Sequence, residues 1–133
     1  QMRTIKFRFR LKLICDNWGK YKKGDIDVFY ITLESLCRFP IDEHWEILSQ
    51  DEFTGLTDKN GVEIYEGDIL TYKRSVGNWT GQFITTTHKI VFSDEVFAFV
   101  MKYGTSYIKL RKHWGYEYEI VGNIYQNEHF LNT

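Results

Sequence analysis

The first strongly patterned part of the chain, residues 5–13, alternates apolar and basic side chains at every step. Isoleucine, phenylalanine and leucine occupy the odd positions, and lysine or arginine occupies the even ones. Successive side chains of a β-strand point to opposite sides, so this period of two predicts a strand with one buried face. Residues 28–33 are rich in β-forming types and predict a second strand. The pattern over residues 35–39 and 42–48 fits either a helical turn or a strand, and Pro40 breaks any regular element between them.

From residue 69 onward, short apolar segments alternate with turn signals. Strands are predicted at residues 69–72, 82–92, 96–101, 107–110 and 118–125. The segment VFAFVM at residues 96–101 has no charge on either face, which predicts a strand inside a closed sheet or beneath a second layer. Short strands separated by turns at this spacing are typical of a small barrel or sandwich.

Two turn signals, DKNG and EGD, follow each other closely in the middle of the chain. At the first, Asp58 can accept bonds from backbone amides two residues on, and Asn60 and Gly61 tolerate positive φ. At the second, Gly67 is a further permissive position and Asp68 can satisfy local amides. We interpret these five residues as structural turns that send the adjoining strands apart. A calcium loop needs further oxygen ligands at fixed steps, so no metal site is predicted here.

Three segments of the chain carry a resemblance to a known family. They are MRTIKFRF at residues 2–9, TGLTDKNGVEIYEGDIL at residues 54–70 and YEIVGNIYQNEHFL at residues 118–131. In these segments the chain is similar to the YopX-like family of bacteriophage and prophage proteins. The resemblance implies a β-rich fold with an SH3-type barrel in its C-terminal part. It implies no established activity, and hence no catalytic residues. The chain departs from the usual family pattern at residues 10–12, residues 50–52 and Glu128.

Pattern and resemblance together predict a mostly β protein with little helix. Residues 1–50 are expected to form a strand-rich N-terminal part. This part is expected to pack on a small SH3-like β-barrel formed by residues 51–133, giving one compact unit. The segment EIYEGDIL supports the barrel, because it looks like the stretch after the diverging turn of SH3-type barrels, where a glycine and an acid precede a core strand.

The composition is that of a globular chain: 133 residues, 43% hydrophobic and 26% charged. No stretch reaches the roughly 18 uncharged residues of a membrane span, and the N-terminal segment lacks the pattern of a signal peptide. Cys15 and Cys37 have no metal-ligand spacing and are expected to be reduced thiols. We therefore expect a cytoplasmic protein of the bacterial host cell, with no membrane partner.

Charge is unevenly distributed, although the net charge is only −1. Residues 1–24 carry +7, residues 25–68 carry −10 and residues 69–133 carry +2. Lys6, Arg8, Arg10 and Lys12 lie on one face of the predicted strand, roughly 6.5–7 Å apart, which is near the spacing of phosphates along a nucleic-acid strand. They are candidates for binding a polyanion or a protein partner. The alternative is a solvated or edge-protecting face that the acidic block neutralises.

A second candidate site lies in or beside the glycine-containing loop at residues 75–81. Its residues are Lys73, Arg74 and Trp79. Exposed aromatic rings beside cations can stack on nucleic-acid bases or form the main contacts to a protein partner. The alternative is that Trp79 covers the mouth of the barrel. Residues 109–114 form a similar cluster, which we interpret as a strand end and a loop.

The sequence contains no recognised catalytic pattern. The four histidines lack ligand spacing, and neither a Gly-x-Ser-x-Gly motif nor a phosphate loop is found. We therefore predict that the protein is not an enzyme and uses no cofactor. The first functional hypothesis is a non-catalytic protein-binding module of phage or prophage origin, whose partner is a host or phage protein or a second copy of the chain. The alternative is a nucleic-acid-binding protein that uses the basic strand face and the Trp79 loop.

Overall fold

The computed structural model describes residues 4–16, 18–38, 43–76, 81–103, 105–110 and 117–132. The chain divides between Phe53 and Thr54 into two compact units, which we call the N-terminal and the C-terminal unit. How the two parts pack on each other stays a prediction. Cys15 and Cys37 are free thiols.

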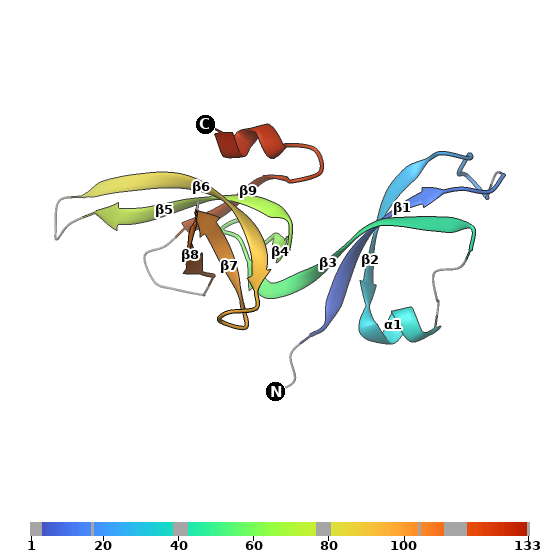
Figure 1. Ribbon diagram of the computed structural model, residues 1–133, viewed down its shortest axis with the longest axis horizontal. Helices are drawn as coiled ribbons and strands as arrows, with labels where there is room; N and C mark the ends of the chain where they lie inside the picture. The colour runs from blue at the N-terminus through green and yellow to red at the C-terminus, as the bar shows by residue number, and fades with distance from the viewer. Residues whose placement is uncertain are drawn as a thin grey trace. The chain divides into compact units, whose positions relative to one another are not determined.

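Strands dominate the described part of the chain (Figure 1). The elements are β1 (Lys6–Leu13), β2 (Ile26–Thr32), α1 (Leu33–Arg38), β3 (Trp45–Thr57), β4 (Glu63–Tyr65), β5 (Asp68–Val76), β6 (Gln82–Ser93), β7 (Ala98–Tyr103), β8 (Ser106–Lys109), β9 (Glu117–Asn123) and the 3₁₀ helix η1 (Glu128–Asn132). They form two antiparallel sheets with the orders β2-β1-β3-β4 and β8-β7-β6-β5-β9. The mostly β fold with little helix is confirmed. The described strands form no closed barrel, and no described helix is long and apolar enough to cross a membrane.

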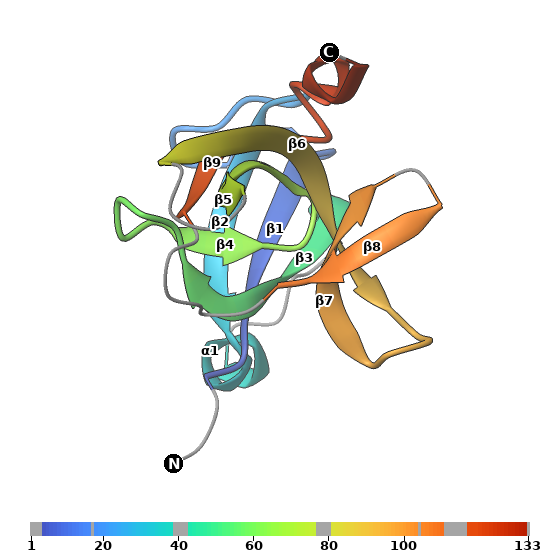
Figure 2. The same cartoon turned by 90° about the vertical axis from the view of Figure 1, so that its left-hand side faces the viewer.

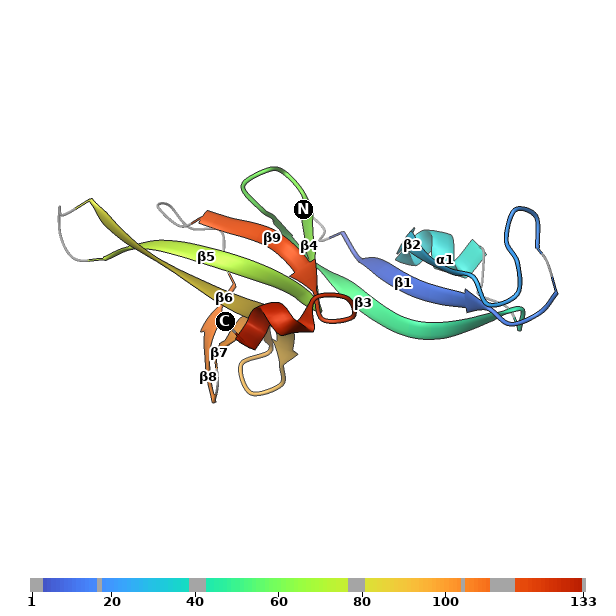
Figure 3. The same ribbon diagram turned by 90° about the horizontal axis from the view of Figure 1, so that it is seen from above.

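In the N-terminal unit, β1 lies between β2 and β3 (Figure 3). Its residues alternate between buried and half-buried from Arg8 to Leu13, as predicted. Phe9, Leu11 and Leu13 are buried on its apolar face. A cluster of aromatic rings from three separate segments, Tyr21, Phe29 and Trp45, adds to this unit, with ring centroids 5.1–6.2 Å apart. The sequence left residues 35–39 undecided. The structure has the short helix α1 at Leu33–Arg38, and the Thr32 hydroxyl caps it by accepting a bond from the Ser35 amide at 3.1 Å.

The sequence also left residues 42–48 undecided between a helical turn and a strand. The structure has the long strand β3 from Trp45 to Thr57, most of which the sequence pattern did not predict. It pairs with β1 in its first part, and β4 is its neighbour on the other side. The prediction that both turns send the adjoining strands apart was therefore wrong for the first turn, which returns β4 alongside β3. The second turn, at Gly67, sends the chain into the other sheet as β5. Because β4 is only three residues long, the chain pairs with β3 briefly and leaves that sheet at the second turn, so only the second turn separates the strands.

In the C-terminal unit, the core is built from side chains of β4, β5, β6, β7 and β9. Its buried members are Ile64, Leu70, Tyr72, Ile90, Phe99, Met101 and Tyr118. The uncharged strand predicted at residues 96–101 begins later, at Ala98, because residues 94–97 form the turn after the curved strand β6 (Figure 2). Three consecutive residues of β7, Phe99, Val100 and Met101, are nevertheless buried, as expected for a strand covered on both faces.

His88 on β6 is a buried histidine of the C-terminal unit. Its Nδ1 lies 3.3 Å from the Lys102 carbonyl oxygen, and its Nε2 lies 2.6 Å from Thr86 Oγ1. A carbonyl oxygen can only accept, so Nδ1 carries the proton and Nε2 accepts a bond from the hydroxyl. Burial lowers the pKa of His88 below its usual value of 6.5, and the ring is therefore neutral at pH 7.

Because only the folded state has this lowered pKa, we expect His88 to make stability depend on pH below 6.5. Well above pH 6.5 the ring is neutral in both the folded and the unfolded state, so it does not make the free energy of unfolding depend on pH. As the pH falls from 6.5, the unfolded chain takes up a proton first, so the free energy of unfolding decreases until the folded ring also titrates. Urea unfolding at pH 7.5 and 5.5 measures this loss. His88→Gln should reduce the difference between the two pH values, whereas His129→Gln, at an exposed position, should leave it. An unchanged difference in His88→Gln would contradict the assignment.

Candidate functional site

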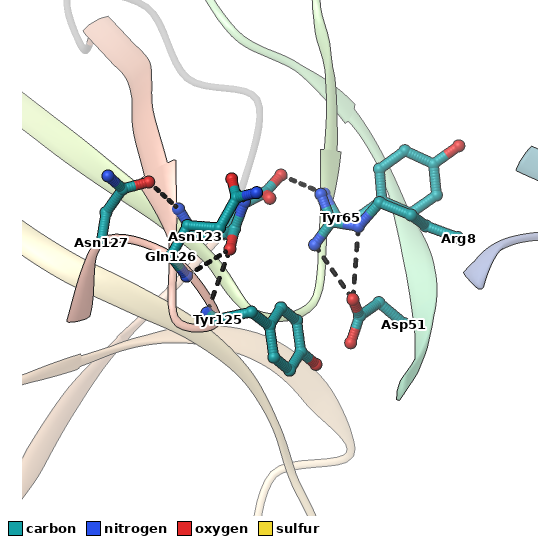
Figure 4. Close-up of polar contacts among 8 residues, drawn as sticks. Arg8, Asp51, Tyr65, Asn123, Tyr125, Gln126 and Asn127 are labelled. Atoms are coloured by element: carbon teal, nitrogen blue, oxygen red, sulfur yellow. Dashed lines mark hydrogen bonds and ion pairs between the residues drawn. The ribbon is translucent and has the colours of Figure 1, made fainter. Parts of the chain in front are cut away.

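The basic row of β1 is the first of the candidate sites. Arg8 lies opposite Asp51 of β3 in the strand register, and its Nε and Nη2 both donate to Asp51 Oδ2, at 3.2 and 3.1 Å (Figure 4). The two side chains are only 12% and 5% exposed. Arg8 is therefore a partly buried, charge-paired residue of the N-terminal unit and presents little positive charge to solvent.

Two other members of the row also have neighbours of their own. The Lys6 ammonium lies 5.1 Å from the centre of the Phe53 ring, a cation–π distance. Lys12 lies opposite Glu46 in the register between β1 and β3. Arg10 lies between them on the same strand and is half-buried. The row is thus brought together on one face as predicted, and acidic and aromatic side chains of β3 accompany it.

The second candidate group is only partly described. Lys73 on β5 is exposed, and its ammonium lies 4.6 Å from the centre of the Phe83 ring on β6. It also lines a shallow hollow of about 110 Å³ in the sheet face, together with Lys59, Thr71, Thr85, Glu117 and Glu119. The two lysines and two glutamates of this hollow balance in charge. The Arg74 side chain, Trp79 and residues 111–114 lie outside the described part of the chain.

The first structural turn is organised by the buried carboxylate of Asp58. Its Oδ1 accepts bonds from the amides of Asn60 and Val62, at 2.8 and 3.0 Å, and Gly61 has a φ of 81°. Its Oδ2 accepts a bond from the Ile120 amide of β9 at 3.1 Å. One side chain therefore closes the turn and also joins it to a strand more than 60 residues away in sequence.

The second structural turn is joined to the residue that directly follows β9. Gly67 has a φ of 88°, and its carbonyl accepts a bond from the Ile124 amide at 2.9 Å. The buried Asp68 accepts a bond from the Tyr65 amide at 2.8 Å. Both turns of the segment 54–70 therefore meet the segment 118–131. The two longer segments that carry the family resemblance lie side by side within the C-terminal unit.

The residues after β9 form a turn of the same kind (Figure 4). Asn123 Oδ1 accepts bonds from the amides of Tyr125 and Gln126, at 3.0 and 3.1 Å. A Cβ atom on Gly122 would lie 2.5 Å from Asn127 Oδ1, so the glycine makes room for this side chain. These polar residues therefore have structural bonds. Among the described residues, no group of three or more His, Cys, Asp or Glu is placed to hold a metal ion.

The turn between β6 and β7 carries a feature that the sequence pattern did not reveal. Ser93 pairs with Ala98, so residues 94–97 form the hairpin turn, at the lower right of Figure 2. Phe97 has a φ of 52°, in the left-handed region that bulky residues rarely adopt, and the residue is 80% exposed. Sequence reasoning missed it because VFAFVM formed one unbroken apolar run, with no glycine to indicate where the turn ended.

An aromatic contact and a side-chain hydrogen bond stabilise the rest of the hairpin. The Phe92 ring lies edge-on to the buried Phe99 ring, with centroids 5.4 Å apart. The Glu95 carboxylate in the turn accepts a bond from the Tyr107 hydroxyl of β8 at 3.2 Å, which raises the pKa of that tyrosine. We call Asp94, Glu95, Val96 and Phe97 the hairpin tip. It combines two acidic side chains with an exposed aromatic ring, and the Phe92–Phe99 and Tyr107–Glu95 contacts hold the hairpin in place.

Comparison with known proteins adds a family assignment. No curated protein matches the chain. Among solved structures, it is similar to the crystal structure of protein EF1440 from Enterococcus faecalis, with 22% sequence identity, a TM-score of 0.43, and coverage of 96% of this chain and 97% of that chain. A family model described as YopX protein matches residues 5–132, and the chain therefore belongs to the YopX family.

Proposed function

We propose that this YopX-family chain is a non-catalytic protein-binding module of phage or prophage origin that acts in the bacterial cytoplasm. The hairpin tip is its contact site, and the exposed Phe97 is the observation that carries the proposal. Left-handed backbone costs a non-glycine residue about 1–2 kcal/mol. A phenylalanine that accepts this cost and buries little of its own surface contributes nothing evident to folding.

The chemistry around Phe97 supports a protein partner. Aromatic side chains are enriched among the residues that dominate protein interfaces. Asp94 and Glu95 beside it are exposed, and acidic groups repel the phosphates of a nucleic acid. The buried carboxylates Asp51, Asp58 and Asp68 all accept structural bonds, which favours a binding role over acid–base catalysis.

A second function, nucleic-acid binding, is favoured by one specific observation. The exposed Lys73 ammonium lies over the exposed Phe83 ring, a pairing suited to a phosphate and a stacked base. Fluorescence anisotropy with labelled single- and double-stranded DNA at 50 and 200 mM salt tests it. Binding that weakens steeply with salt and is lost in Lys73→Ala would favour this alternative over the first.

The SH3-like barrel also remains part of the proposal. In the five-stranded sheet, β5 to β8 follow one another as neighbours, and β9 returns to lie beside β5. A meander whose last strand returns to its first is the arrangement that such small barrels use. The strong curvature of β6 in Figure 2 supports the same interpretation.

Phe97→Gly is expected to raise the free energy of unfolding by about 0.5–1 kcal/mol. Glycine removes about 1–2 kcal/mol of backbone strain, which stabilises the folded state. It also increases the entropy of the unfolded chain, which lowers the free energy of unfolding by about 0.5–1 kcal/mol. Phe97→Ala keeps the strain and should remain within about 0.5 kcal/mol of the unmodified protein. Urea unfolding of the three proteins measures both. If Phe97→Gly is clearly destabilised, the ring serves folding and the proposal loses its main support.

The binding role itself is tested by photo-crosslinking in bacterial cells. Phe97 is replaced by p-benzoylphenylalanine, and the matched control carries the same residue at the exposed position Gln126. A discrete protein adduct at position 97 that is absent at position 126 supports the proposal. Equal labelling at both positions, or no adduct at position 97, contradicts it.

A further inference from the structure

The outer edge of β2 is a second surface suited to an interaction. β2 is the terminal strand of its sheet, and no described strand pairs with its outer side. Its seven residues, IDVFYIT, contain one charge and no proline. A mostly uncharged strand of this length at a sheet edge is a template for adding another strand, unless the protein blocks it.

The register shows which backbone groups face outward. The amide of Leu33 bonds the carbonyl of Ile5, and the amide of Leu13 bonds the carbonyl of Asp25. Both pairs follow the β1–β2 register, in which bonded and non-bonded pairs alternate. The odd residues of β2 therefore bond β1, and the N–H and C=O groups of the even residues, including Val28, point away from the sheet.

Asp27 is the second residue of this edge strand. Its Oδ1 accepts the outward N–H of Val28 at 2.7 Å, and its Oδ2 accepts the Tyr21 hydroxyl at 2.6 Å. The Tyr21 ring is in turn held edge-on against Trp45, with centroids 5.1 Å apart. Because Asp27 lies opposite the buried Leu11, it is a carboxylate on the apolar face of an edge strand. The Tyr21 bond and the Val28 amide lower the pKa of Asp27, which keeps it ionised at neutral pH.

We propose that Asp27, held by Tyr21, blocks a second copy of this chain from pairing with the outer edge of β2. The strand is self-complementary. Antiparallel pairing about Phe29 sets Val28 against Tyr30 of the second copy and Ile26 against Thr32, with the outward-facing groups in register. This pairing needs the Val28 N–H that Asp27 holds. It also sets the Asp27 carboxylate against Ile31, where a charge loses water without gaining a partner.

Sedimentation velocity at matched protein concentrations tests this blocking role. Asp27→Val should lower the dimer dissociation constant at least about tenfold relative to the unmodified chain. Asp16→Val, which removes the same charge at an exposed position, should leave it unchanged. Asp27→Val/Val28→Pro should return it to the original value, because proline removes the N–H that strand addition needs but that β1 does not use.

Two results would overturn the proposal. One is an Asp27→Val protein that is folded by circular dichroism and sediments as the unmodified chain does. The other is association that persists undiminished in the Val28→Pro double variant, which would place it on another surface. If Asp27→Val does not fold, Tyr21→Phe replaces it as the decisive variant, because it keeps the ring and removes only the hydroxyl that holds Asp27. It should shift the dissociation constant in the same direction by a smaller factor, and no shift would reject the proposal.

Discussion

Replacing Asp58 by alanine is expected to lower the free energy of unfolding by about 3 kcal/mol. The carboxylate is buried and accepts three backbone amides, those of Asn60, Val62 and Ile120. Removing the acceptor leaves these three part-buried amides without that partner, at a cost on the order of 1 kcal/mol each. The loss is large because these bonds both close the turn and join it to β9.

The measurement is equilibrium urea unfolding with linear extrapolation. Asp58→Asn should be intermediate, since the amide keeps one oxygen acceptor for the turn but presents an NH2 donor to the Ile120 amide. Asp94→Ala removes an exposed carboxylate from another turn and should change stability by less than about 0.5 kcal/mol. A loss no larger in Asp58→Ala than in Asp94→Ala would mean that the carboxylate is not part of the scaffold.

Replacing Asp51 by alanine is expected to cost about 3 kcal/mol in the free energy of unfolding. The change removes the oxygen that accepts both Arg8 bonds and leaves a charged side chain that is only 12% exposed. Breaking one side of a buried ion pair costs more than the pair contributes, because the remaining charge stays out of water. Urea unfolding of the variant gives the value directly.

The double variant Arg8→Met/Asp51→Leu separates charge burial from other causes. Both charges are then absent, and apolar side chains of similar size take their place, so most of the lost stability should return. If the double variant is less stable than Asp51→Ala, the pair is needed for more than mutual neutralisation.

Arg8→Met alone should leave any DNA affinity unchanged, since the Arg8 guanidinium is bonded to Asp51. A clear loss of affinity would mean that the basic row of β1 binds a polyanion.

The sequence by itself determined the local elements where one face of a strand is buried. The alternation at residues 5–13 gave β1 almost to the residue, since a period of two has only one strong interpretation. The sequence also predicted the mostly β class from its many short apolar segments. Gly61 and Gly67 were predicted to permit positive φ, and both have it, because the conformation of a short turn depends mainly on its own residues. The family resemblance was likewise readable from short segments and is confirmed by the family match.

Only the tertiary structure decided what each side chain contacts. Asp58 reaches Ile120, Arg8 reaches Asp51, and Asp27 reaches Tyr21, through registers and turns that no local pattern contains. The sequence indicated a turn at residues 93–95, but it missed for the same reason that this turn extends to Phe97. The register that ends β6 at Ser93 and restarts at Ala98 forces Phe97 into a conformation that its own chemistry disfavours. Local preferences are worth about 1 kcal/mol per residue, so the pairing of whole strands overrides them wherever the two conflict.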